Sequence, residues 1–161
     1  LEHIKMARWS KYTYGLIGAF FDTPRRIREE REATELAMEY LEMFGVAQYA
    51  NQWIPNLPYG AQRRVEMARA LVTEPKVLFL DEPTVGMTPD ELWSMIEVIR
   101  TAHQRFNLAI FLIEHRLTVF RELCQRVQAL VFGEVITEGT PTEVQENPKV
   151  IEAYLGEEDV E

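Results

Sequence analysis

The sequence has a single cysteine, a deficit of positive charge and no long apolar run. Cys124 has no partner within the chain, so an internal disulfide is impossible and a cytosolic protein is expected. No apolar stretch approaches the roughly 18 residues needed to span a bilayer, so any membrane contact would go through a partner. The net charge of −9 makes nucleic acid an unfavourable partner, because like charges repel the phosphate backbone.

The sequence also lacks a glycine-rich loop of the kind that binds nucleotide phosphates. The sequence contains eight glycines, and the pattern G-x-x-x-x-G-K-[ST] occurs nowhere in its 161 residues. In that loop, successive backbone N–H groups and a lysine surround the phosphates of a nucleotide. A chain without it lacks most of a phosphate cradle.

The most informative segment is residues 76–83, which read KVLFLDEP. Its apolar part predicts a strand buried on both faces, and Pro83 prevents the strand from continuing. Asp81 and Glu82 therefore lie at the carboxyl end of the strand, which is where ligands bind in open parallel sheets. Asp81 suits the coordination shell of Mg²⁺, and Glu82 suits the polarisation of a water molecule. An acidic surface turn is the alternative interpretation of the same residues.

Two further patterns accompany this strand. Residues 109–113 (AIFLI) predict a second strand, which ends in Glu114 and His115. A lone histidine is more often structural than catalytic, but His115 repeats the position of Asp81 at the end of a neighbouring strand. Upstream, residues 57–64 (LPYGAQRR) form a glycine-containing turn that leads into a helical pattern.

The order of these motifs resembles the ATP-binding subunit of ABC transporters. The resemblance identifies residues 57–64 with the family's signature motif, residues 76–82 with Walker B, and His115 with the switch histidine. The details IEH at residues 113–115 and AYLGE at residues 153–157 look most like the branched-chain (hydrophobic) amino-acid uptake branch. The implied fold is α/β, an incomplete P-loop NTPase (ABC ATPase) core with an N-terminal helical subdomain.

The resemblance also implies roles for individual residues. Asp81 would order Mg²⁺ through water, and Glu82 would orient or deprotonate the water that attacks the γ-phosphate. His115 would hold the γ-phosphate by a hydrogen bond, so Glu82 and His115 are the expected catalytic residues. The residues expected to contact the nucleotide from the signature turn are Tyr59, Gly60, Ala61 and Gln62.

This turn departs from the family's common Leu-Ser-Gly-Gly-Gln pattern. Pro58 replaces the serine, and Pro58 has neither a hydroxyl nor an N–H to offer a phosphate. Gly60 and the N-terminal end of the following helix remain, and a helix N-terminus favours anions. The sequence therefore predicts a variant turn with a weaker hold on the nucleotide.

By resemblance, the chain corresponds to the C-terminal two-thirds of a nucleotide-binding domain, without Walker A or the glutamine loop. It is expected to be inactive alone. The complete subunit would use ATP and Mg²⁺ and pair head to tail with a second ATPase subunit, identical or different. It would also bind transmembrane permease subunits, which would place it at the cytoplasmic face of the cell membrane.

Periodicity divides the chain into three parts. Residues 1–73 are expected to form the helical subdomain, with one long helix over residues 25–44. Residues 74–156 alternate strands and helices as part of an α/β core, and residues 157–161 form an acidic tail. Thr88 and Thr140 each precede proline and stand three residues before glutamate, which predicts two capping boxes.

The missing strand of the resembled fold would lie between residues 109–113 and residues 127–132. These two strands are therefore expected to pair directly or to recruit a strand from a second copy, because unpaired edges bind other chains. A different functional class stays open: a naturally truncated, non-catalytic interaction protein that docks on intact ATPase subunits. An ATPase of the DNA-repair type is disfavoured by the acidic charge.

Overall fold

The computed structural model describes residues 1–13, 21 and 23–158. Contacts within the chain divide it into two compact units. Unit 1 comprises Leu1–Phe79 and Val85–Phe111, and unit 2 comprises Leu80–Thr84 and Leu112–Glu161. The division at residues 73 and 156 that the sequence predicts stays a prediction.

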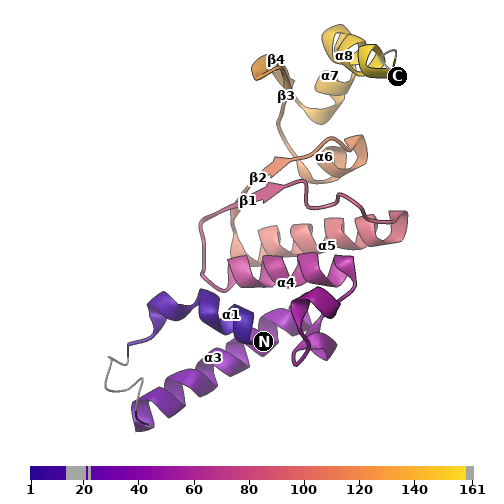
Figure 1. Ribbon diagram of the computed structural model, residues 1–161. Helices are drawn as coiled ribbons and strands as arrows, with labels where there is room; N and C mark the ends of the chain where they lie inside the picture. The colour runs from indigo at the N-terminus through magenta and orange to yellow at the C-terminus, as the bar shows by residue number, and fades with distance from the viewer. Residues whose placement is uncertain (14–20, 22, 159–161) are drawn as a thin grey trace. The chain divides into compact units, whose positions relative to one another are not determined.

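Unit 1 is built mainly from helices (Figure 1). The long helix expected over residues 25–44 is confirmed as α3, Pro24–Met43, whose first turn is capped by the Thr23 side chain accepting from Arg26 N at 3.2 Å. The other α-helices are α1 (Glu2–Ala7), α4 (Tyr59–Leu71) and α5 (Pro89–Phe106). Short 3₁₀ turns are η1 (Trp9–Lys11), η2 (Ala47–Tyr49) and η3 (Ile54–Asn56).

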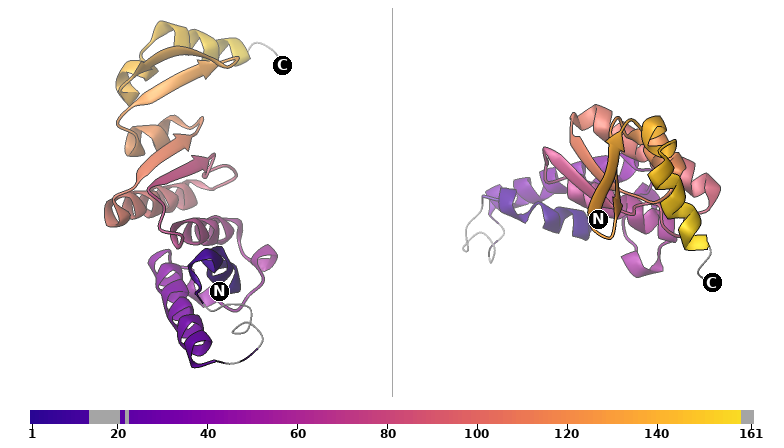
Figure 2. Two further views of the ribbon diagram at one scale, coloured as in Figure 1. Left: turned by 90° about the vertical axis from the view of Figure 1, so that its left-hand side faces the viewer. Right: turned by 90° about the horizontal axis from the view of Figure 1, so that it is seen from above.

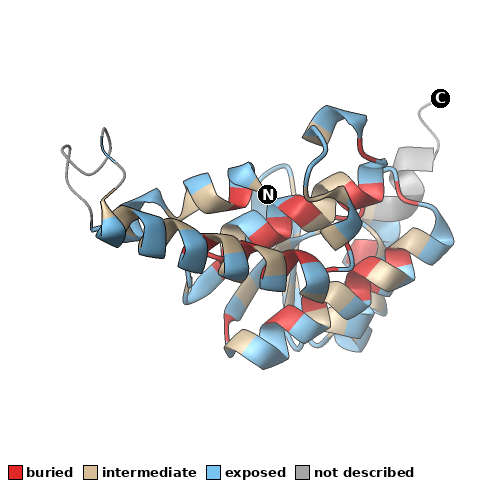
Figure 3. Cartoon of the chain, turned by 90° about the horizontal axis from the view of Figure 1, so that it is seen from below, coloured by how far each residue is buried: buried red, intermediate tan, exposed pale blue. Residues whose placement is uncertain are grey.

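The core of unit 1 lies where these helices meet. Helices α1 and α3 pack on α4, and α4 packs on α5. Buried positions recur along single faces of the long helices while the opposite faces are exposed (Figure 3), as the 3.6-residue period requires. Ala37, Ala68 and Ile96 are fully buried, and the Tyr40 and Phe106 rings stack at 5.4 Å. Among the described residues, no helix is both long enough and apolar enough to cross a membrane.

Two strands follow helices α4 and α5 in the sequence. Strand β1 (Val77–Asp81) and strand β2 (Ala109–Ile113) form a two-stranded sheet. Ala109 N donates to Lys76 O at 3.0 Å where the two strands begin, and Glu82 N donates to Ile113 O at 2.9 Å where they end. The two strands therefore run parallel, and their carboxyl ends lie together.

The expectation that β1 is buried on both faces is wrong. Leu78 and Leu80 are 6% and 9% exposed, whereas Phe79 on the other face is 74% exposed. Its ring lies 5.6 Å from that of Phe111, which is 55% exposed. An unbroken apolar run fits a strand covered on either one or two faces, so the sequence did not distinguish the two cases.

Unit 2 contains an antiparallel hairpin with short helices against it (Figure 2). Strands β3 (Val127–Val131) and β4 (Glu134–Gly139) pair with an irregularity between Ala129 and Leu130. Helices α7 (Pro141–Gln145) and α8 (Pro148–Glu158) contact β4, and α6 (Leu117–Leu123) contacts α7. Helix α8 extends into the acidic tail, and residues 159–161 lie outside the described part of the chain.

The strands over residues 109–113 and 127–131 do not pair with each other. In the described part of the chain, β1 and β2 form one sheet, and β3 and β4 form another. The expectation of direct pairing across the missing strand is therefore wrong: among the described strands, β3 pairs with β4 alone, and its other edge does not pair with β2. The other expectation, recruitment of a strand from a second copy, stays a prediction.

Both predicted capping boxes are confirmed. At the start of α5, Glu91 N donates to Thr88 Oγ1 at 3.4 Å, and Thr88 N donates to a Glu91 carboxylate oxygen at 3.0 Å. The same reciprocal pair joins Thr140 and Glu143 at the start of α7. The hydrogen bond from the Thr88 amide, followed by that from its hydroxyl, lowers the pKa of Glu91 below its ordinary value of 4.5.

We expect Thr88→Ala to destabilise the chain by about 1 kcal/mol, because a cap acceptor is lost. For a chain of this size, that corresponds to a melting temperature lower by about 2–4 °C in a thermal denaturation experiment. Thr101→Ala is the matched control, since Thr101 is exposed within the same helix and alanine has the higher helix propensity. An equal fall of the melting temperature in both variants would show that the Thr88 cap does not stabilise the helix.

Candidate functional site

Glu82 occupies an unusual backbone conformation directly after β1. Its φ is +44°, in the left-handed region that non-glycine residues rarely adopt. Such a conformation costs on the order of 1–3 kcal/mol and persists where neighbouring contacts enforce it. Here the Glu82 N–H is held by Ile113 O, and Pro83, which is buried, follows at once. The turn leaves the Glu82 side chain 49% exposed at the end of the sheet.

His115 lies beside this carboxylate. Its Nδ1 is 3.4 Å from Glu82 Oε1, and its side chain is 58% exposed. Both residues belong to unit 2, where they follow the ends of two adjacent parallel strands. The structure thus brings together the two residues that the sequence predicts to be catalytic. Their roles in catalysis stay predictions.

Asp81 is the last residue of β1, and its side chain is exposed. Within the residues that the structure describes, no group of three or more acidic, histidine or cysteine side chains could enclose a metal ion. Mg²⁺ does not require such a group, because it keeps several waters and is usually bound by one or two carboxylates together with substrate phosphates. A single exposed carboxylate is therefore a donor set that fits Mg²⁺ held through water.

A second pair of residues supports the same turn and was not identified as a pair from the sequence. Thr84 is fully buried, and both its amide N and its Oγ1 donate to Glu114 Oε1, at 3.1 and 2.5 Å. Among the described residues, Glu114 Oε2 is buried without a hydrogen-bond partner. In the sequence, the only indication of a role for Glu114 was its place between the end of β2 and His115. The sequence did not indicate which group it would bind.

The predicted signature turn lies in unit 1 and begins α4. Pro58 occupies the N-cap position and supplies no side-chain cap. Pro58 O accepts from Ala61 N at 2.9 Å and from Gln62 N at 3.0 Å, and Gln62 Nε2 donates to Leu57 O at 2.9 Å. These groups are engaged within the turn, whereas the amides of Tyr59 and Gly60 have no acceptor among the described residues. Those two amides are the ones that the turn can offer to an anion.

The side chains around this turn fix its shape. The Tyr59 hydroxyl accepts from Arg63 Nε and Nη2 at 3.0 and 2.8 Å, and the Tyr59 side chain is 39% exposed. Gly60 is buried, and a Cβ there would lie 3.2 Å from Glu91 Oε1. Ala61 is also buried. Of the four residues predicted to contact nucleotide, Tyr59 therefore presents an exposed side chain, and all four contacts stay predictions.

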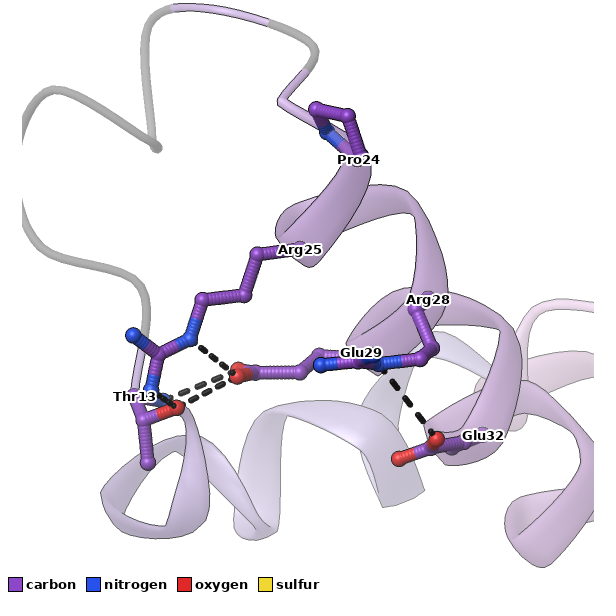
Figure 4. A pocket seen from close by; sticks show the side chains of 6 residues that line it. All are labelled: Thr13, Pro24, Arg25, Arg28, Glu29 and Glu32. Carbon is purple, nitrogen blue, oxygen red and sulfur yellow. Dashed lines mark hydrogen bonds and ion pairs between the residues drawn. The ribbon is translucent and has the colours of Figure 1, made fainter.

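An open groove near the N-terminus does not resemble this predicted site. It has a volume of about 680 Å³, and the residues that line it are Thr13, Pro24, Arg25, Arg28, Glu29 and Glu32 (Figure 4). Its cationic side chains are already paired: Arg25 Nε is 3.1 Å from Glu29, and Arg28 Nε is 3.9 Å from Glu32. Hydrogen bonds from Thr13 and the adjacent Arg25 lower the pKa of Glu29 to about 2. Among the described residues that line the groove, both arginines are therefore paired with glutamates.

Comparison with known families gives two matches. The sequence model of the ABC transporter family matches residues 5–85. A second model, described as branched-chain amino acid ATP-binding cassette transporter, matches residues 134–160. The two matched ranges together cover the predicted signature turn, the end of β1, strand β4 and helices α7 and α8.

Curated relatives agree with these matches. The chain is 38% identical over 157 residues to the high-affinity branched-chain amino acid transport ATP-binding protein LivG of Salmonella typhimurium, covering 98% of this chain and 62% of that protein. It is 36% identical over 160 residues to the corresponding BraF protein of Pseudomonas aeruginosa, with the same shares covered. The chain therefore spans about three-fifths of the length of these relatives.

Solved structures show the same fold. The ADP conformation of MJ1267, an ATP-binding cassette of an ABC transporter, has a TM-score of 0.73 at 24% identity, covering 96% of this chain and 61% of that one. A second structure of MJ1267 has a TM-score of 0.69 at 27% identity over 76% of this chain and 50% of that one. The fold is thus that of ABC ATPase domains, which are P-loop NTPases of the α/β class.

We expect the 161-residue chain by itself to bind Mg–ATP with a dissociation constant above about 1 mM or not measurably. The reason is that Tyr59 and Gly60 offer few amides and the phosphate loop is absent from the sequence. Isothermal titration calorimetry measures this directly. A micromolar dissociation constant would contradict the expectation and indicate a phosphate site elsewhere in the chain.

Proposed function

This chain belongs to the ABC transporter family, and on that premise we propose that it is part of the ATP-hydrolysing subunit of an importer of branched-chain amino acids. The proposed substrate class is supported by the family model that matches residues 134–160 and by the names of the LivG and BraF relatives. The activity belongs to the complete subunit, of which this chain supplies the signature turn, the Walker B strand and the switch histidine.

The observation that carries the proposal is the arrangement of Glu82 and His115. The left-handed turn after β1 directs a carboxylate to within 3.4 Å of a histidine nitrogen at the end of the adjacent strand. A carboxylate in that place can accept a proton from water, and a histidine can donate a hydrogen bond to a phosphoryl oxygen. Positioning and charge stabilisation of this kind account for most of phosphoryl-transfer catalysis.

The complete subunit would use ATP and Mg²⁺. Asp81 would hold the ion through water, and the bound ion would offset negative charge on the phosphates. From the second subunit of a head-to-tail dimer, Tyr59 and Gly60 would present their amides to the nucleotide. Transmembrane permease subunits are the remaining partners, and through them the subunit would lie at the cytoplasmic face of the membrane.

The competing proposal of a truncated, non-catalytic interaction protein makes a different use of the same surfaces. In that proposal, the signature turn would bind an intact ATPase subunit, and Glu82 and His115 would have no catalytic role. Substitutions at Glu82 and His115 in the complete subunit test the catalytic proposal.

Glu82→Gln in the complete subunit, reconstituted with its permease partners, should lower ATP turnover by about 10²-fold or more while leaving ATP affinity unchanged. The amide keeps the shape of the side chain but cannot take a proton from water. Glu134→Gln is the control, because Glu134 is an exposed carboxylate in β4 of the same unit. Wild-type turnover in the Glu82 variant would overturn the assignment of a general base.

His115→Ala should reduce turnover and ATP affinity while leaving ADP affinity nearly unchanged, because only ATP carries the γ-phosphate that His115 would contact. Parallel titrations with the two nucleotides measure the difference. His103→Ala is a control at a structural histidine, whose Nδ1 lies 2.7 Å from Leu108 O. Equal losses for ATP and ADP in the His115 variant would show that His115 is structural too.

A further inference from the structure

The one fully buried polar side chain among the described residues lies two positions after Glu82. Thr84 makes both of its hydrogen bonds to a single acceptor, Glu114 Oε1, at 3.1 Å from its amide N and 2.5 Å from its hydroxyl. Glu114 directly precedes His115. This contact therefore joins the segment that carries one proposed catalytic residue to the segment that carries the other.

The backbone of Glu82 explains why such a connection is needed. Its φ of +44° is maintained only if both sides of the turn are held in place. On the strand side, Glu82 N donates to Ile113 O at 2.9 Å. On the far side, the Thr84–Glu114 hydrogen bonds hold the turn to the residue that follows Ile113. The same short stretch of chain thus anchors the turn at both of its ends.

The chemistry of Glu114 suits this role better than that of a neutral residue. Hydrogen bonds to a carboxylate are roughly twice as strong as those between neutral groups. Glu114 Oε2 is buried without a partner among the described residues, which is unfavourable for stability. Glu114 therefore holds the turn through Oε1 alone, by its two hydrogen bonds from Thr84.

We propose that Glu114 is a positioning residue for ATP hydrolysis, which holds the turn at residues 82–84 so that Glu82 and His115 face each other. Glu114 does not touch the nucleotide or the attacking water in this role. It acts through Thr84 on the direction of the Glu82 side chain. The inference rests on the proposed function, since it assumes that Glu82 acts on water in the complete subunit.

The test uses the complete subunit with its permease partners and measures kcat and KM separately. Glu114→Ala should lower kcat by about 10-fold to 10²-fold, the range that a displacement near 1 Å produces, with KM for ATP changed by less than about twofold. Glu114→Gln keeps an acceptor oxygen and the shape of the side chain but loses the charge, so kcat should fall by less than in Glu114→Ala. Glu134→Ala, at an exposed position of β4, is the matched control and should behave as wild type.

A second pair of variants keeps the test decisive if Glu114→Ala does not fold. Thr84→Val preserves the volume of the side chain but removes the hydroxyl donor, so kcat should fall, whereas Thr84→Ser should retain it. If both single variants fold, the double variant Thr84→Val/Glu114→Ala should have the same kcat as Glu114→Ala alone. The reason is that both substitutions remove the same contact. Additive losses would overturn the inference.

Other outcomes separate this inference from the proposed function. If Glu82→Gln abolishes turnover while Glu114→Ala and Thr84→Val keep wild-type kcat, the positioning role is wrong and the proposed function stands. If Glu82→Gln keeps wild-type turnover, the proposed function is wrong, and the positioning role that assumes it is wrong as well. A loss of kcat in Glu114→Gln equal to that in Glu114→Ala would also overturn the inference, since an acceptor oxygen would then be irrelevant.

Discussion

The parallel pairing of β1 and β2 is the constraint on which the rest of the candidate site depends. It places the carboxyl ends of two strands side by side, and the Glu82 N–Ile113 O hydrogen bond extends the pairing one residue into the turn. Thr84 and Glu114 then close the far side of that turn. Glu82 and His115 lie close together because each follows the carboxyl end of one of the two paired strands. Their proximity is set by the strand pairing and does not require packing between the two side chains.

The same sheet is buried on one face and exposed on the other. Leu78 and Leu80 are buried on one face, while Phe79 and Phe111 stay largely exposed on the other. Strands of parallel sheets in α/β proteins are ordinarily covered on both faces. The face that carries Phe79 and Phe111 departs from that arrangement, since both aromatic residues are more than half exposed.

The signature turn shows how a local substitution changes what a helix end can offer. With Pro58 at the N-cap, no side chain satisfies the first amides of α4, and Pro58 O takes those of Ala61 and Gln62. The amides of Tyr59 and Gly60 remain, and the tyrosine ring is held by Arg63. An anion would meet backbone amides and an aromatic side chain here, in place of the serine hydroxyl of the common motif.

Features that depend on local rules follow from the order of the residues. Each of the following is a property of neighbouring residues and could be predicted from the sequence: the apolar period of residues 25–44, the capping box at Thr88, the strand over residues 109–113 and the lack of a phosphate loop. Tertiary structure alone decided the contact of Glu82 with His115, the hydrogen bonds of Thr84 to Glu114 and the exposure of Phe79. The first two depend on the register of strands that are distant in sequence, and the third depends on how many layers cover a sheet, which an apolar run does not record.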